Sequence, residues 1–285
     1  MTEQPRLRID EVPGDDVAGG PVALSDLTGA WVNTDQHVTG RVLRMEVSES
    51  DGRLRVRCFG PGETEPRDWG EVEAHALART PAGGDAWGFW CRFDLDTIQT
   101  DLAAYYNSGV IVVGSFNSFG PTSGRTDYWK REFFYREDRG EVGPVGTGGA
   151  TDFTYAHDRF EGGRPVRPPL DLAPILGTWV GFSEELTGAT EVELGEDDEE
   201  GPWARITGSG EGDGPDWGRV AAHLFADDVG RQEAFAFRAR YDHDHERVEL
   251  FAYLNRRVLI AELATEFTDA SGRAPYYVRT FYRCR

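Results

Sequence analysis

Two histidines with matching surroundings are the residues best suited to acid–base chemistry. His75 follows Trp69 by six residues, and His223 follows Trp217 by the same interval. An even interval places both members of a pair on one face of a regular strand. Because imidazole exchanges protons near neutral pH, His75 and His223 are the candidate catalytic residues. The alternative is that each histidine belongs to a buried, hydrogen-bonded structural network.

Aromatic side chains and two arginines form the candidate binding set. The segments at residues 128–135 and 276–281 alternate aromatic with basic side chains, so several of them share a face. An aromatic box that contains an arginine suits a planar, partly anionic organic molecule. The predicted ligand-binding residues are Trp31, Trp69, Trp90, Tyr105, Tyr128, Arg131, Trp179, Trp217, Tyr253, Tyr276 and Arg279.

The stretch Asp242–Glu246 has the residue types of a metal site, because it reads Asp-His-Asp-His-Glu. The equivalent stretch Asp94–Ile98 has no histidine, and a solvated hairpin turn is the simpler interpretation. We predict no metal and no cofactor. The nucleophile elbow, phosphate loop, dinucleotide fingerprint and His-Glu-x-x-His motif are all missing from the sequence. Hydrolase, kinase and dehydrogenase functions therefore have no support, and whether the protein is an enzyme stays open.

An internal repeat organises these residues. Gly29-Ala30-Trp31 recurs 148 residues later as Gly177-Thr178-Trp179. The same offset carries Asp68-Trp69-Gly70 onto Asp216-Trp217-Gly218, His75 onto His223, Tyr105 onto Tyr253, and Ser123-Gly124-Arg125 onto Ser271-Gly272-Arg273. A constant offset without gaps predicts two copies of one complete domain, because the unit is too long for a solenoid repeat.

Each copy consists of short alternating apolar segments separated by turns, which predicts strands. Turn signals such as Asp51-Gly52 and Asn107-Ser108-Gly109 divide the first copy into about eight strands. Closing the sheet removes its edges and leaves an interior able to hold one small ligand. The predicted fold is all-β, with two tandem antiparallel barrels. The predicted domains are a leader (1–23), a first barrel (24–136), a Gly/Pro-rich linker (137–170) and a second barrel (171–285).

The segment Ala86–Phe93 is apolar on both faces, so we expect it to be buried on both sides. Simple alternation places Trp87, Phe89, Cys91 and Phe93 on one face and Ala86, Gly88 and Trp90 on the other. The equivalent segment of the second copy carries Arg238 and Arg240, which predicts an exposed end or arginines paired with acids. Specific function is expected where the two copies differ, including in only one of them.

The opening run Gly29-Ala30-Trp31-Val32-Asn33, with Thr39-Gly40, resembles the start of calycin barrels, and is closer to the avidins than to the lipocalins. In lipocalins an arginine of a late strand packs over the tryptophan of this opening. The resemblance implies that role for Arg131 and Arg279. Trp31 and Trp179 would then plug the barrel floor, which is the alternative to a place in a ligand-binding wall.

A more specific resemblance covers nearly all of both copies. The run Cys58–Gly70, followed by Phe119 and Ser123-Gly124-Arg125, is similar to a small bacterial calycin-like domain that has no general assigned activity. In the second copy Phe267–Arg273 supplies the closing motif. Members often carry two cysteines around the segment before Asp-Trp-Gly. Here these places hold Gly62 and Arg67, then Gly210 and Pro215, so the resemblance implies no disulfide. The Asp-Trp-Gly motif itself is expected to be a tight turn in which the aspartate bonds nearby backbone.

Charge and composition restrict the partners. The net charge of -20 repels phosphate backbones, so nucleic acid is not expected as a partner. No apolar run is long enough to span a bilayer and the first residues lack the pattern of a secretory signal, so no membrane partner is expected. Three cysteines without metal-site spacing point to the cytoplasm. A homo-oligomer is compatible with all of these features.

Three functions fit these patterns. The first is binding of a small, largely apolar or aromatic molecule in a barrel lumen. The second is a cofactor-free cyclase or isomerase of bacterial specialised metabolism, with a lumen histidine and a tyrosine or acid as catalysts. The third is a structural or interaction protein whose filled barrels pack on each other or in an oligomer. The abundance of aromatic residues and the missing catalytic motifs favour the first.

Overall fold

The computed structural model describes residues 20–35, 42–62, 65–95, 98–120, 125–137, 170–182, 188–209 and 214–285. Within them the chain is all-β, as predicted, and its strands form one 17-stranded sheet. We call residues 20–137 the first half and residues 170–285 the second half. The predicted leader, the interior of the predicted linker and the Thr39-Gly40 and Ser123-Gly124 motifs lie outside the described residues.

The strands of the first half are β1 (Val22–Ala23), β2 (Gly29–Asn33), β3 (Arg44–Ser50), β4 (Arg53–Gly60), β5 (Arg67–Ala78), β6 (Gly84–Leu95), β7 (Ile98–Asn107), β8 (Val110–Phe119) and β9 (Tyr128–Arg136). Those of the second half are β10 (Gly177–Gly181), β11 (Ala189–Asp197), β12 (Gly201–Gly208), β13 (Asp216–Ala226), β14 (Ala234–Asp242), β15 (Glu246–Asn255), β16 (Val258–Phe267) and β17 (Tyr276–Cys284).

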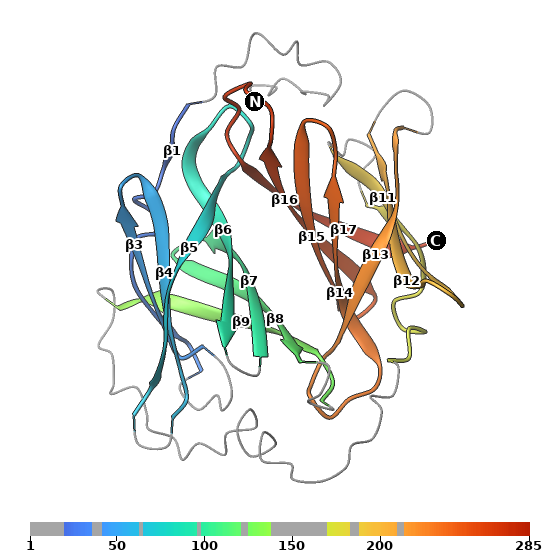
Figure 1. Cartoon of the computed structure of the whole chain (residues 1–285), viewed down its shortest axis with the longest axis horizontal. Coiled ribbons are helices and arrows are strands. Elements are labelled where there is room, and N and C mark those ends of the chain that lie inside the picture. The colour runs from blue at the N-terminus through green and yellow to red at the C-terminus, as the bar shows by residue number, and fades with distance from the viewer. Residues whose placement is uncertain are drawn as a thin grey trace.

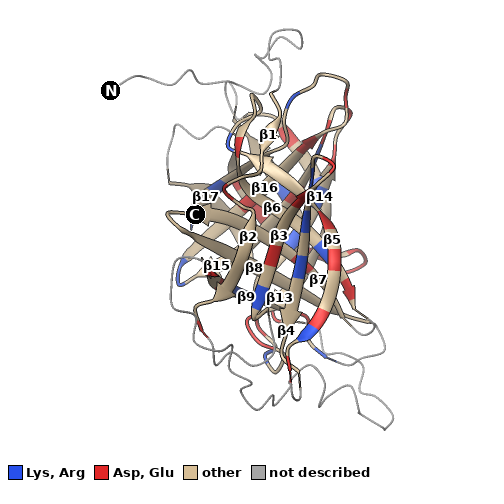
Figure 2. Cartoon of the chain, turned by 90° about the vertical axis from the view of Figure 1, so that its left-hand side faces the viewer, with Lys and Arg blue, Asp and Glu red and all other residues tan. Residues whose placement is uncertain are grey.

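Each half is an antiparallel meander. Every strand from β2 to β9 pairs with the next, and β9 also pairs with β2; β10 to β17 follow the same order, and β17 also pairs with β10. Figure 1 shows the two halves side by side, the first in blue to green and the second in yellow to red. Arginines and carboxylates line the outside of β3, β4 and β5 (Figure 2), where Arg53 pairs with Glu73. Among the described residues no helix is long and apolar enough to cross a membrane.

Inward-facing side chains fill each half with one apolar cluster. The clusters are built from alternate residues of consecutive strands, as the period of a pleated strand requires. Their largest members are Trp31, Phe89, Phe93 and Phe134 in the first half and Trp179, Phe237, Tyr241 and Tyr282 in the second.

The Asp-Trp-Gly motif is a β-bulge in both halves. In β5 the carboxylate of Asp68 accepts the N–H of Gly70 at 2.9 Å, and Gly70 has a φ of 86° that favours glycine. Asp216 and Gly218 repeat this geometry in β13, with the same 2.9 Å bond and a φ of 82°. The prediction that the aspartate bonds nearby backbone is confirmed. The motif lies within a strand, whereas we expected it to precede one.

A second bulge changes the predicted faces of β6. Leu77 pairs with Gly88 and Ala78 with Ala86, so Trp87 is an extra residue in the ladder. Trp87 therefore turns away from the interior that Phe89, Cys91 and Phe93 share, and the predicted common face for Trp87 and Phe89 is wrong. Phe235 is the extra residue in β14 for the same reason. The expected burial of this strand on both sides holds in part: its inward residues are buried, whereas on the other side Trp87 and Trp90 are half-buried and Arg92 is exposed.

A third apolar cluster lies between the halves. It joins outward-facing residues of β5–β9, such as Phe116 and Trp129, to residues of β13–β17, such as Phe251 and Tyr253. Two backbone hydrogen bonds, from Ala78 to Pro275 at 2.8 Å and from Ala226 to Asp127 at 2.9 Å, cross the boundary in equivalent places. The two halves thus share one buried contact surface.

Candidate functional site

Both predicted catalytic histidines lie on the outside of their own half. The bulge at Trp69 and Gly70 shifts the alternation of β5, so Trp69, Val72 and Ala74 contact the interior and His75 does not. The second half repeats this arrangement around Trp217 and His223. The prediction that each histidine shares a face with its preceding tryptophan is therefore wrong. Each histidine instead contacts a carboxylate of the opposite half.

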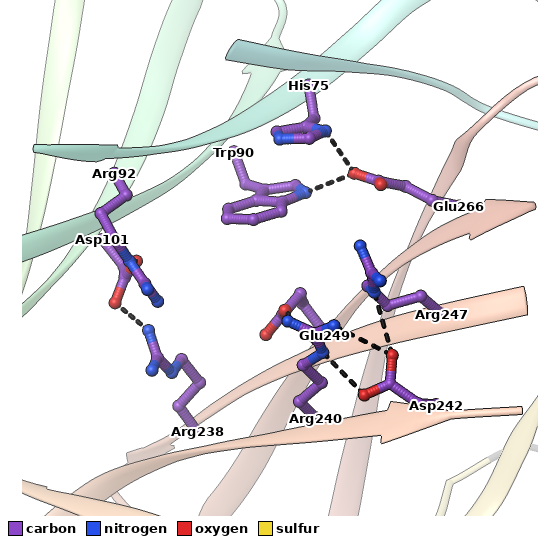
Figure 3. Close-up of polar contacts among 10 residues, drawn as sticks. All are labelled: His75, Trp90, Arg92, Asp101, Arg238, Arg240, Asp242, Arg247, Glu249 and Glu266. Carbon is purple, nitrogen blue, oxygen red and sulfur yellow. Dashed lines mark hydrogen bonds and ion pairs between the residues drawn. The ribbon is translucent and has the colours of Figure 1, made fainter. Parts of the chain in front are cut away.

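His75 belongs to a polar cluster at the boundary (Figure 3), and 45% of its side chain is exposed. Its Nδ1 lies 2.6 Å from Glu266 Oε1, and its ring stacks on Trp90 with centroids 4.3 Å apart. Trp90 Nε1 donates to the same Glu266 oxygen at 3.0 Å. Burial tends to raise the pKa of Glu266, but hydrogen bonds from His75 and Trp90 outweigh it and leave the pKa lowered. This geometry fits the structural interpretation of His75.

His223 has a similar partner, and its side chain is 42% exposed. Its Nε2 lies 2.7 Å from Asp127 Oδ2 of the first half, and Asp127 is 5% exposed. The other carboxylate oxygen, Oδ1, accepts the backbone N–H of Phe119 at 2.7 Å. The imidazole stacks on Phe225 with centroids 4.6 Å apart. A buried carboxylate thus holds the His223 ring in one orientation.

A cleft of about 570 Å³ lies beside His223. Its walls are formed by side chains of β13 and β14, the adjoining ends of β11 and β12, and the segment before β10, and the first half contributes Thr126 and Asp127. The complete lining is Thr126, Asp127, Leu170, Leu172, Glu196, Pro202, Ala221, Ala222, His223, Leu224, Arg238, Ala239 and Arg240. The cleft thus combines an apolar wall with two arginines and the histidine–carboxylate pair.

The two arginines of this cleft belong to a larger charged cluster (Figure 3). Asp101, whose side chain is fully buried, pairs with Arg238 and also accepts from Arg92 Nε at 2.7 Å. Burial, together with the charges of Arg92 and Arg240, lowers the pKa of Arg238. Asp101 is thus shared by two arginines, one from each half.

Arg240 is anchored by acids of its own half. Its guanidinium donates to both oxygens of Asp242, at 2.9 and 3.0 Å, and lies 3.8 Å from Glu249. Burial raises the pKa of Glu249 above its ordinary value, and the nearby arginines act in the opposite direction. The expectation that Arg238 and Arg240 either end at the surface or pair with acids is confirmed in its second form.

The corresponding place in the first half is occupied by Trp90. Arg238 pairs with His223 across β13 and β14, and Trp90 pairs with His75 at the equivalent rung of β5 and β6. The indole of Trp90 lies flat on His75, with 5° between the ring planes, where the second half has an ion-paired arginine. The halves therefore differ in the charge beside the histidine, while the exposure of the two imidazoles is nearly the same.

Four of the tryptophans predicted to bind ligand instead pack into the apolar interiors of the two halves. Trp31 is 1% exposed and donates to the carbonyl of Leu27 at 2.8 Å, and Trp179 donates to Ile175 at 2.9 Å. Trp69 and Trp217 pack on the edges of the interior clusters. These contacts fit the alternative of a structural plug for Trp31 and Trp179.

A different arginine from the expected one covers Trp31. The guanidinium of Arg136 lies over the Trp31 ring at 4.9 Å and donates to the carbonyls of Asp26 and Thr28. Arg131 instead donates to the hydroxyl of Tyr105 at 2.9 Å, so the role inferred for it from lipocalins is wrong. At the place equivalent to Arg136 the second half has Cys284, which pairs with Trp179.

The remaining predicted binding residues lie at the boundary or at strand ends. Arg279 donates to the hydroxyl of Tyr253 at 3.2 Å and lies over the ring of Tyr105. Tyr128 packs with Phe119 and Ile98. Tyr276 stacks on Phe267, and burial raises its pKa to about 12. The predicted set is thus divided among two interiors, the boundary and the periphery, and only His223 of the predicted site residues lines the cleft.

The stretch Asp242–Glu246 forms the turn between β14 and β15, as its hairpin interpretation predicted, and His243 N donates to Glu246 O at 2.8 Å. No group of three or more histidine, cysteine or acidic side chains suited to a metal ion occurs in the part of the chain that the structure describes. Sequence reasoning missed Asp101 and Asp127, because nothing near them in the chain marks them as partners of the second half.

No protein-family model matches this chain, and a search of curated proteins gives no match.

Proposed function

We propose that the protein binds a small, partly apolar organic anion in the cleft beside His223. The observation that carries this proposal is the pairing of one fully buried carboxylate, Asp101, with two arginines in a chain of net charge -20. Arg238 and Arg240 line the cleft and attract an anionic group, while of the two acids in the lining Asp127 is engaged by His223 and the other is Glu196.

The size and apolar walls of the cleft fit the same ligand class. A volume of about 570 Å³ lies within the range of small-molecule sites, and Leu170, Leu172 and Leu224 offer apolar contact. A carboxylate at the arginines and a hydrocarbon or aromatic body against the leucines would satisfy both sides of the cleft.

The proposal assigns one site to the molecule, in the second half. At the equivalent rung of the first half Trp90 stacks on His75 and is tied to Glu266. A ligand there would meet an uncharged indole in the place of the Arg238 guanidinium.

The scaffold that we propose for this site is a tandem of two calycin-like barrels. The β2–β9 and β10–β17 pairings and the offset of 148 residues between Gly29 and Gly177 support it. The packed clusters inside each half favour the cleft over a lumen as the binding place. Packing of one barrel on the other then has a structural role, since it brings Asp127 to His223. The free cysteines Cys58, Cys91 and Cys284 support a cytoplasmic location.

Calorimetric titration of the protein with a panel of aryl and alkyl carboxylates tests the proposal. We expect at least one member to bind, and Arg240→Gln to weaken it about tenfold through loss of a charge-assisted contact. Arg57→Gln on the outside of β4 is the matched control and should leave the affinity unchanged. If no carboxylate binds, or if Arg240→Gln and Arg57→Gln bind as tightly as the unaltered protein, the proposal is wrong.

A further inference from the structure

We infer that the His223–Asp127 pair gives this cleft an acid–base activity, in which His223 moves a proton to and from a carbon atom of a bound 2-oxo acid. This inference rests on the proposed binding function and adds a reaction to it. The geometry that carries it is a histidine that lines a cleft and is held in place by a carboxylate with only 5% exposure.

The pairing fixes which ring nitrogen is available. Asp127 Oδ2 lies 2.7 Å from Nε2, and a carboxylate only accepts hydrogen bonds, so Nε2 carries the proton. Nδ1 then holds a lone pair and is the base. Asp127 is itself fixed by the N–H of Phe119, and its own carbonyl accepts the N–H of Ala226. The orientation of His223 is therefore set before any ligand arrives.

The reaction is a proton transfer that needs no oxidant or cofactor. Nδ1 of His223 removes a proton from the carbon next to the keto group, and the electron pair of that C–H bond forms the enolate. Arg238 and Arg240 stabilise the negative charge on the enolate oxygen and the carboxylate. The imidazolium then returns the proton to carbon or to the enolate oxygen, which gives exchange or keto–enol interconversion. Asp127 balances the positive charge of the imidazolium in between.

His75 does not carry the same activity, although it too has a carboxylate partner and is as exposed as His223. It does not line the cleft, and its neighbour on the next strand is Trp90, which has no charge to stabilise an enolate. The activity is thus assigned to the second half, where Arg238 takes the place of that indole.

Phenylpyruvate is a suitable probe because it combines a carboxylate, an acidic C–H bond at C3 and an apolar ring. Proton NMR in D₂O measures exchange at C3, and calorimetry measures binding of the same compound. We expect the protein to accelerate exchange, and His223→Ala to lower that acceleration about a hundredfold while the Kd changes less than about threefold. Added imidazole should restore part of the exchange in His223→Ala, which a purely structural role of His223 would not allow.

Two further variants complete the experiment. Asp127→Asn should lower exchange by removing the charge that supports the imidazolium, and His245→Ala in the β14–β15 turn is the matched control, expected to exchange like the unaltered protein. Binding of phenylpyruvate without accelerated exchange, or unchanged exchange in His223→Ala, overturns this inference and leaves the binding function in place. Absence of binding by phenylpyruvate and by every carboxylate of the panel overturns both.

Discussion

The ring of Trp129 stacks on the ring of Tyr253 across the boundary between the halves, with centroids 4.3 Å apart. Tyr105 and Tyr277 make the counterpart contact at 6.0 Å. Trp129 and Tyr277 are separated by the same 148 residues as Tyr105 and Tyr253, so each half offers the same two positions to the other. Reciprocal contacts of this kind are typical of two-fold interfaces. They also supply the first prediction.

Truncation of the boundary core should destabilise the whole protein. Phe251 is 1% exposed and its ring lies 5.2 Å from that of Phe116. Phe251→Ala leaves a cavity between the halves and should cost about 3–5 kcal/mol of unfolding free energy, measured by urea denaturation. Phe281→Ala, at a side chain that is 44% exposed, is the control and should cost less than about 1 kcal/mol. Equal losses in the two variants would contradict a buried boundary.

Making the second half resemble the first should close the cleft. In Arg238→Trp an indole takes the place of the arginine beside His223 and also removes one positive charge. We expect carboxylate binding to fall at least tenfold, measured by calorimetry, while the circular dichroism spectrum is retained. Trp90→Phe, the aromatic control in the first half, should keep the affinity within about twofold. Retained binding in Arg238→Trp would place the ligand elsewhere.

Removing a competing carboxylate should tighten binding. Glu249 lies 3.8 Å from Arg240, so Glu249→Gln frees positive charge for the ligand. The expected gain is about three- to tenfold in affinity, or roughly 1 kcal/mol. Burial raises the pKa of Glu249 above its ordinary 4.5, so this carboxylate becomes protonated at a higher pH than an exposed glutamate. The affinity of the unaltered protein should therefore approach that of the variant as the pH falls. Glu71→Gln on the outside of β5 should show neither effect.

The Glu266 carboxylate should stabilise the boundary in a pH-dependent way. Its pKa is lowered in the folded protein, so its contribution is present above the unfolded pKa of 4.5 and is lost as the pH falls through the folded value. Glu266→Gln should therefore cost about 1–2 kcal/mol at pH 7, and the difference from the unaltered protein should vanish in strong acid. Urea denaturation across this pH range measures it. A difference that stays constant down to pH 2 would show that the charge of Glu266 is not involved.

Much of the local structure could be predicted because it follows from short-range chemistry. Alternating apolar residues and turn pairs such as Asp51-Gly52 allowed the strands to be predicted. The residue types of Asp68 and Gly70 allowed the prediction that the aspartate bonds nearby backbone. The burial of the inward residues of β6 and the acidic partners of Arg238 followed from residue types alone.

The faces of the bulged strands and the partners across the boundary could not be predicted. One extra residue, Trp87, reverses which side chains of β6 point inward and which point outward. Residue propensities do not show where in a strand such an extra residue lies. Asp127 reaches His223 from 96 positions away in the chain, so no spacing rule connects them. The lipocalin resemblance led to Arg131, whereas Arg136 covers Trp31, because the register of β9 against β2 decides which arginine arrives there.

Asp127 comes from the first half, and this has a consequence for the free energy of ligand binding. The cleft beside His223 is a composite site, since the first half supplies Thr126 and Asp127 and the second half supplies the rest of the lining. A ligand that contacts both sets of residues binds the docked arrangement of the halves more tightly than the separated halves. Linkage then works in both directions: occupancy strengthens docking by the same free energy with which docking improves affinity. A bound ligand would therefore stabilise the contact between the halves, and its release would remove that stabilisation.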